Sequence, residues 1–121
     1  MIGVGVDVVA IERFRVALLR TPSMRARLFT AEELDYVAAK ADPVPSLAAR
    51  FAAREAVMKA LGLGLGAFGF HDVWVRVNEG GAPSLVVTAH ARELADERHV
   101  SAWHLSLSHD GPVAIAMVTA S

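Results

Sequence analysis

The chain has 121 residues and a formal net charge of −1 at pH 7, which excludes a generally basic nucleic-acid binder and restricts anion recognition to local sites. It contains no cysteine, which excludes disulfides and cysteine-type zinc sites, and no apolar run near the roughly 18 residues of a membrane span. With 54% hydrophobic residues and no basic n-region of a signal peptide, the composition predicts a soluble, cytoplasmic, single-domain protein over residues 1–121, with apolar surface left for an oligomer interface.

Residues 1–9 predict a buried β-strand with two unlike faces. The period of two puts four apolar side chains on one face, those of Ile2, Val4, Val6 and Val8. The other face carries Gly3, Gly5 and Asp7. This is unusual, because glycine inside a strand often marks the close approach of another backbone or of a ligand. The pattern leaves equally open that Asp7 ends the strand and caps the next helix.

Two helices are expected next, over residues 10–20 and from about residue 30 to 40. Arg13 and Arg20 share one stripe of the first helix. A solvated face is the usual explanation of such charges, and a docking ridge for an acidic protein is the alternative. Thr30 and Glu33 form a capping box that begins the second helix. Residues 41–45 predict a connector, because two prolines forbid continuation of either neighbouring helix.

Residues 46–62 predict a mostly buried helix, because they are rich in Ala and Leu and their apolar residues go nearly all the way round. Ser46 is the expected N-cap, and Gly62 is the expected left-handed residue after the helix. Charges on such a helix need partners, and they form two pairs spaced by four, Arg50 with Arg54 and Glu55 with Lys59. Spacing favours a Glu–Lys helix pair and tethered arginines; the alternative is a cation-holding carboxylate beside phosphate-holding basic residues.

The rest of the chain predicts two hairpins and one helix. The glycine-rich segment 62–69 does not match a phosphate loop and is expected to be a connector. Strands are expected over residues 72–77, 84–88, 102–109 and 113–119, with a helix from 88 or 89 to 97. Pro83 suits the first residues of the second of these strands. Hairpin connections make the sheets mainly antiparallel, so the predicted class is α+β in the order β-α-α-α-β-β-α-β-β.

Three stretches together resemble the holo-acyl-carrier-protein synthases, the small 4′-phosphopantetheinyl transferases of fatty acid synthesis and lipid metabolism. They are Gly3-Val-Gly-Val-Asp-Val-Val9 with the following Ile11-Glu-Arg-Phe14, Ala49-Arg-Phe-Ala-Ala-Arg-Glu-Ala-Val-Met-Lys-Ala-Leu-Gly62, and Trp103-His-Leu-Ser-Leu-Ser-His109. The resemblance covers essentially the whole chain. It implies transfer of 4′-phosphopantetheine from coenzyme A to a serine of apo acyl carrier protein, with release of adenosine 3′,5′-bisphosphate.

The resemblance also implies roles for individual residues. Asp7 and Glu55 match a carboxylate pair that holds Mg²⁺, which suits a diphosphate attacked by an alcohol, and with Lys59 they are the expected catalytic residues. The residues expected to bind coenzyme A are Arg50, Arg54, Lys59, Gly62, Pro83, Ser108 and His109. Arg13 matches the arginine that docks the acidic carrier protein, and Arg20 lies on the same stripe.

Two departures from the family concern ligand affinity. Arg54 stands where the family usually has lysine, and a planar fork is not interchangeable with an ammonium group. Ala82, before Pro83, stands where the family usually has Lys or Arg, so a basic contact to the nucleotide end of coenzyme A is missing or supplied from elsewhere.

Assembly and substrate leave alternatives open. Family members of this length are typically homotrimers with active sites shared between neighbouring subunits, which agrees with the surplus of apolar residues. One alternative is a non-catalytic trimeric module that binds nucleotides or carrier proteins. Another is a transferase that acts on the carriers of secondary metabolism.

Overall fold

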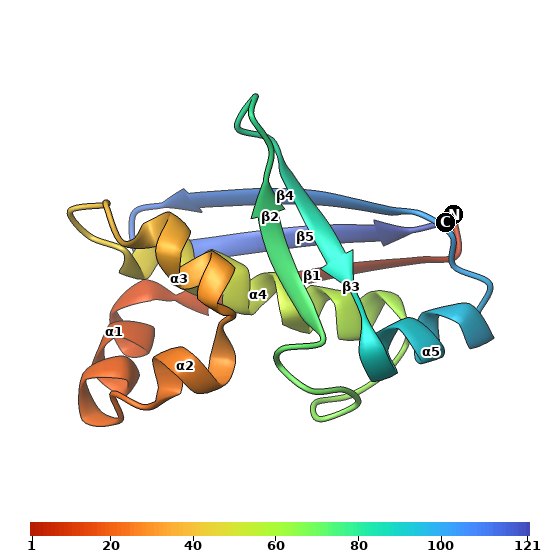
Figure 1. The fold of residues 1–121 in the computed structure, drawn as a ribbon, viewed down its shortest axis with the longest axis horizontal. Coiled ribbons are helices and arrows are strands. Elements are labelled where there is room, and N and C mark those ends of the chain that lie inside the picture. Colours follow the sequence, from red (N-terminus) through yellow and green to blue (C-terminus); the bar gives the residue numbers. More distant parts are fainter.

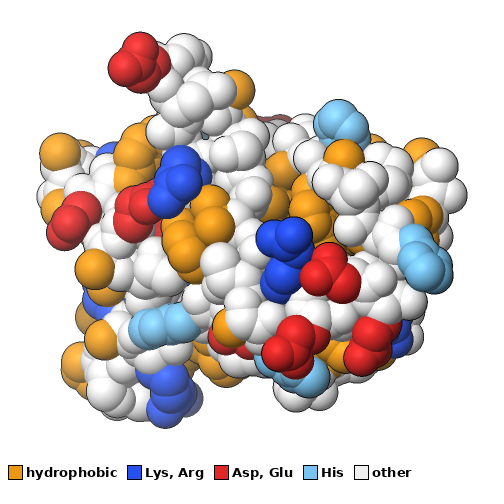
Figure 2. All heavy atoms as spheres, turned by 45° about the vertical axis from the view of Figure 1, so that its right-hand side comes forward, with side chains coloured by type: hydrophobic (Ala, Val, Ile, Leu, Met, Phe, Trp, Pro, Cys, Tyr) orange, Lys and Arg blue, Asp and Glu red, His pale blue; other side chains and the backbone are white.

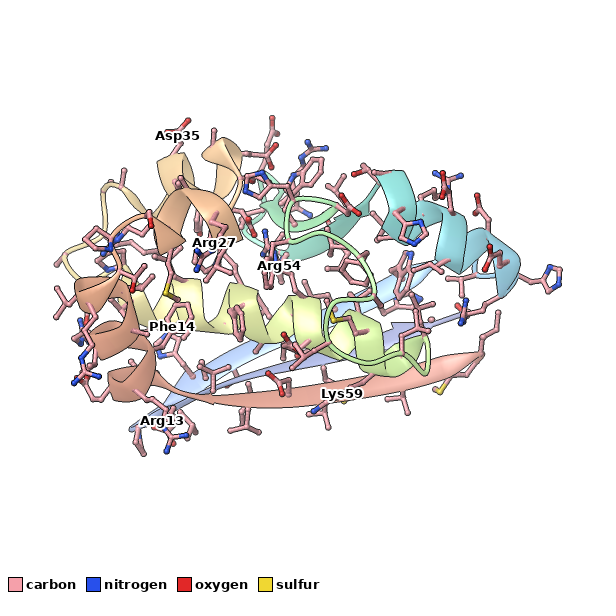
Figure 3. All side chains as sticks on the ribbon, turned by 90° about the horizontal axis from the view of Figure 1, so that it is seen from below. Arg13, Phe14, Arg27, Asp35, Arg54 and Lys59 are labelled. Atoms are coloured by element: carbon pink, nitrogen blue, oxygen red, sulfur yellow. The ribbon has the colours of Figure 1, made fainter.

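The long helix α4 (Val44–Ala60) lies between two antiparallel sheets, as the ribbons in Figures 1 and 3 show. The computed structural model describes all of residues 1–121. The other elements are β1 (Gly3–Ala10), α1 (Ile11–Arg20), α2 (Met24–Leu28), α3 (Ala31–Val37), β2 (Val73–Val77), β3 (Pro83–Val87), α5 (Ala89–Glu97), β4 (Trp103–Asp110) and β5 (Val113–Ala120). The predicted α+β class is confirmed. The order gains only α2, whose five residues are too few to show a helical period.

The larger sheet has the strand order β1-β5-β4, and the smaller is the β2–β3 hairpin. β5 pairs with β1 from Gly3 opposite Ala120 to Ala10 opposite Val113, and with β4 on its other side. The predicted capping box is confirmed at the start of α3, where Glu33 N donates to Thr30 Oγ1 at 3.3 Å and Thr30 N donates to Glu33 Oε1 at 3.0 Å.

One face of β1 packs on α4, and it is the glycine face. A Cβ on Gly5 would lie 1.9 Å from the carbonyl oxygen of Ala56, and one on Gly3 would lie 1.9 Å from that of Ala60. Only glycine allows the two backbones to come this close. The expectation of a buried valine face is therefore wrong for the single chain, because four apolar residues on the other face are exposed: Ile2, Val4, Val6 and Val8.

Helix α4 begins two residues earlier than expected, and Ser46 is not its N-cap. Pro43 is the N-cap residue and Pro45 lies in the first turn, where a missing N–H costs no helical hydrogen bond. The predicted end is confirmed. Gly62 has a φ of +72° and donates to Lys59 O at 3.0 Å, while Leu63 N donates to Met58 O at 2.8 Å, which together form a Schellman motif.

Two clusters of buried side chains cover α4 along its length. One gathers around α1, α2, α3 and the first half of α4, and the other around β2, α5 and the second half. The helix is thus held from several sides, which gives its few polar residues fixed positions. None of the helices combines the length and the apolar character needed to cross a membrane.

Candidate functional site

The packing of β1 on α4 brings together three of the predicted site residues. Asp7 follows the two glycines on the face of β1 that meets the helix, and its side chain is 18% exposed. Lys59 Nζ donates to Asp7 Oδ1 at 3.2 Å and to the carbonyl oxygen of Val6 at 3.0 Å. Figure 3 shows the labelled Lys59 beside β1. The sequence alternative in which Lys59 pairs with Glu55 is therefore not what the structure contains.

Glu55 lies one turn before Lys59 and is the unsatisfied member of the group. Its Oε1 is buried and has no hydrogen-bond partner. Burial raises the pKa of the Glu55 carboxyl, the charge of Asp7 raises it further, and Lys59 opposes both effects. The carboxylates of Asp7 and Glu55 therefore repel each other, and Lys59 does not fully neutralise their combined charge.

The donor set fits a hard divalent cation. The chain has no cluster of three or more histidine, cysteine or acidic residues that could hold a metal ion. Mg²⁺ does not require one, because it usually takes one or two carboxylates and completes its shell with substrate phosphates and water. The unpartnered Glu55 oxygen beside Asp7 is the kind of atom that such an ion would satisfy.

Arg54 lies apart from these carboxylates and is held by another part of the fold, so its contact with coenzyme A stays a prediction. Its side chain is fully buried and donates from two nitrogens to both carboxylate oxygens of Glu33. Its Nε donates to the carbonyl oxygen of Phe70 at 2.7 Å, and Glu33 Oε2 also accepts from Val75 N at 3.1 Å. This ion pair joins α3, α4 and β2. The sequence indicates that an arginine on a buried helix requires a buried acidic partner. It does not show that this partner is the capping residue Glu33.

Arg50, one turn before Arg54, is nearly as buried, at 4% exposed, but has no carboxylate partner. Its Nη1 donates to the carbonyl oxygen of Ser46 at 3.2 Å, and its buried Nε has no partner. Burial lowers the pKa of the Arg50 guanidinium, and the charge of Glu33 only partly offsets this. A bound anion would supply the missing counter-charge.

Four other predicted ligand positions are not brought to Asp7 within one chain. His109 lies opposite Ala114, which lies opposite Val9, so two strand spacings of roughly 4.8 Å separate His109 from β1. Ser108 precedes it and is exposed. Gly62 is exposed beyond the end of α4, and Pro83 lies in the β2–β3 hairpin that projects from the molecule in Figure 1.

The two predicted docking arginines, Arg13 and Arg20, are exposed on α1. Arg13 also lines an apolar groove of about 290 Å³ that is bounded by Phe14, Phe51 and the end of β1. This groove, which sequence reasoning missed, adjoins the carboxylates through Val9 and through Phe51, one turn before Glu55.

The largest cavity lies elsewhere, between β3, α5 and the start of β4. It measures about 340 Å³ and includes Val87, Arg92 and Trp103 in its lining. Figure 2 shows this side of the molecule, where acidic, basic and hydrophobic side chains are interspersed without a patch of one charge. Neither the carboxylates nor Arg50 line this cavity.

Comparisons with known proteins match nearly the whole chain to one family. The family model of the 4′-phosphopantetheinyl transferase superfamily matches residues 3–118. A holo-[acyl-carrier-protein] synthase of Micrococcus luteus is 48% identical over 122 residues, covering 99% of this chain and 91% of the relative. A synthase of the same name from Streptomyces coelicolor is 48% identical over 120 residues, covering 99% and 97%.

Solved structures show the same fold. The crystal structure of holo-[acyl-carrier-protein] synthase from Neisseria meningitidis superposes with a TM-score of 0.90 at 30% identity and covers 100% of this chain and 98% of its own. The synthase from Helicobacter pylori, in complex with coenzyme A, superposes with a TM-score of 0.80 at 27% identity, covering 98% and 99%.

Proposed function

Because the chain belongs to the holo-[acyl-carrier-protein] synthases, enzymes of the 4′-phosphopantetheinyl transferase superfamily, we propose that it transfers phosphopantetheine from coenzyme A to a serine of an apo acyl carrier protein. The serine Oγ forms a bond to the phosphorus that carries the pantetheine arm. The phosphoanhydride bond breaks, adenosine 3′,5′-bisphosphate leaves, and the serine proton is released to solvent. The observation that carries the proposal is the close packing of β1 on α4, which sets Asp7 beside Glu55.

Asp7 and Glu55 are the residues that would hold Mg²⁺. When bound there, the ion neutralises charge on the diphosphate and on the leaving group. Two features would orient the carboxylates for this role: the hydrogen bond from Lys59 to Asp7, and the half-buried position of Glu55 on a helix packed on both sides. Lys59 is 53% exposed, so its ammonium group can turn from Asp7 to a phosphate oxygen as a point charge. Arg50 supplies a second cation for coenzyme A phosphates.

The active form is proposed to be a homotrimer whose sites lie between neighbouring subunits. The support is the exposed apolar face of β1, which continues on β5 with Met117 at 47% exposure. Apolar surface of this extent on a small protein marks an interface. Ser108 and His109 lie at the far side of the sheet from β1, so a neighbouring chain would present them to coenzyme A. Gly62 and Pro83 keep their predicted role in binding this ligand.

Arg13 and Arg20 are proposed to dock the acyl carrier protein. Both are exposed on α1, and carriers of this kind are strongly acidic, so the pair would guide encounter most visibly at low salt. The apolar groove beside Arg13 gives the docked carrier a route toward the carboxylates.

The deciding experiment is incubation of the protein with coenzyme A, Mg²⁺ and an apo carrier protein, followed by mass spectrometry of the carrier. We expect the carrier to gain the mass of one phosphopantetheine, and we expect chelation of divalent metal to prevent the gain. No gain beside an active control enzyme would support the non-catalytic binding module instead. Parallel reactions with carriers of fatty acid synthesis and of secondary metabolism identify the preferred substrate.

A further inference from the structure

Helix α4 carries two buried arginines, Arg50 and Arg54, but only Arg54 is paired with a buried carboxylate. Arg54 donates to both oxygens of Glu33, whose other contacts are backbone N–H groups and the Thr30 hydroxyl. Glu33 therefore has no oxygen left for Arg50. Burying a charge without a counter-charge costs free energy. The burial of Arg50 therefore suggests that its guanidinium has a function.

Tyr36 is what faces Arg50 in place of a carboxylate. The guanidinium carbon of Arg50 lies 4.9 Å from the centroid of the Tyr36 ring, which is within the range of a cation–π contact. Lys40 Nζ lies 5.4 Å from the same centroid. Figure 3 shows α3, marked by Asp35, next to the side of α4 that carries Arg54, one turn from Arg50.

An aromatic ring stabilises a cation without consuming its hydrogen-bond donors. Arg50 has one donated hydrogen bond to Ser46 O, and its Nε is unpartnered. The Tyr36 ring thus restricts the direction of the guanidinium plane while leaving most of its N–H groups free for an anion. A carboxylate in the same place would occupy two of them.

We propose that Tyr36 is a positioning residue for coenzyme A, whose ring holds the Arg50 guanidinium ready for a phosphate group of that ligand. The proposal rests on the proposed function for the identity of the anion, and on the Tyr36–Arg50 geometry for the role of the ring. Tyr36 itself is 46% exposed, so one part of the ring remains in contact with solvent. Tyr36 acts through Arg50 and takes no part in the chemistry.

The test compares Tyr36→Leu with Tyr36→Phe. Both side chains cover the stem of Arg50 with apolar surface, but only Phe offers a π face. Calorimetric titration with coenzyme A should give a Kd about fivefold to tenfold higher for Tyr36→Leu and unchanged within about twofold for Tyr36→Phe. In the transfer assay, Tyr36→Leu should raise the KM for coenzyme A and leave both kcat and the KM for the carrier near the wild-type values.

A double-mutant cycle shows whether the ring acts through Arg50. In an Arg50→Met background, Tyr36→Leu should cause no further increase in the Kd for coenzyme A. Lys40→Ala is the matched control, because it removes the other cation over the same ring, and it should leave the Kd within about twofold of wild type.

Three results would overturn the proposal: an unchanged Kd in Tyr36→Leu, additive effects of the two substitutions, or a Lys40→Ala variant that reproduces Tyr36→Leu. Normal transfer by the wild-type chain together with any of these would reject the role of Tyr36 and leave the proposed function standing. Absence of transfer by the wild-type chain would reject the function, while the Kd values would still decide the role of the ring.

Discussion

At the scale of single residues, Glu55 is a carboxyl group whose ionisation the fold disfavours. Its pKa is raised by burial and then by Asp7, so the native state binds the proton more tightly than the unfolded chain does. Below the unfolded pKa both states are protonated and the effect on stability is absent. As pH rises through the raised folded pKa, ionisation of Glu55 destabilises the native state.

Glu55→Gln should therefore separate activity from stability. The substitution removes a charge proposed to serve the metal, so transfer should fall below detection. Without metal at pH 7, thermal unfolding should show a Tm equal to or above that of the wild type, and this advantage should disappear at pH 4. A variant with near-normal transfer would reject the metal assignment, and one with a much lower Tm at pH 7 would reject the electrostatic argument.

Substitutions at Glu33 and at its neighbour Glu32 compare a buried ion pair with an exposed one. Glu33→Gln leaves Arg54 buried without a counter-charge and should lower the free energy of unfolding by about 3–5 kcal/mol. Glu32→Gln breaks an exposed pair with Arg76, at 45% and 53% side-chain exposure, and should cost less than about 1 kcal/mol. Urea unfolding of both variants measures the difference; similar values would mean that the burial of the Arg54–Glu33 pair has no special energetic role.

At the scale of elements, the contact between β1 and α4 decides whether the carboxylates meet. Gly5→Ala should lower both stability and transfer, because the new Cβ would lie 1.9 Å from Ala56 O and would force the strand away from the helix. Gly64→Ala, in the loop after α4, has no atom within 4 Å of its added Cβ and should change neither. Thermal unfolding and the transfer assay should distinguish the two. A silent Gly5→Ala would mean that the strand can move without loss of the site.

The elements themselves were largely predictable from the sequence. Alternation, prolines and caps located the strands, α3 and the end of α4, because these depend on local chemistry. The start of α4 was misplaced because a proline in a first helical turn looks like a helix breaker. The expected burial of β1 holds for only one of its faces, because a period of two shows which residues share a face but not which face meets the core. Hydrophobicity favoured the valines, whereas within one chain the glycines face the helix.

The candidate site was predictable only in part, for a related reason. Resemblance to a family indicated Asp7, Glu55 and Lys59, and the structure brings them together. The sequence does not reveal the partner of Arg54, because Glu33 is 21 positions away and the capping box already accounts for it. Tertiary partners of this kind leave no periodic trace in a sequence.

At the scale of the whole molecule, a charge placed on the exposed valine face of β1 should disrupt the proposed assembly. Val6 is 51% exposed near the middle of β1, so Val6→Lys should leave the chain folded but prevent assembly through this face. Sedimentation should show a smaller species than the wild type, and transfer should be lost with it. Leu19→Lys, at a residue 72% exposed on α1, should not change the sedimentation. Unaltered assembly in Val6→Lys would place the interface elsewhere.

The pairing of β1 with β5 also has a consequence for the order of folding. Asp7 lies opposite Ala116, so the strand that carries the carboxylate hydrogen-bonds to a strand from the other end of the chain. Closing so long a loop is entropically expensive and slow compared with formation of helices or of the local β2–β3 hairpin. A refolding chain should therefore protect the amides of α4 from hydrogen exchange before those of β1. The site would then be among the last features to form, and a chain stalled before β5 would hold a helix with its charges in place and no second carboxylate to meet them.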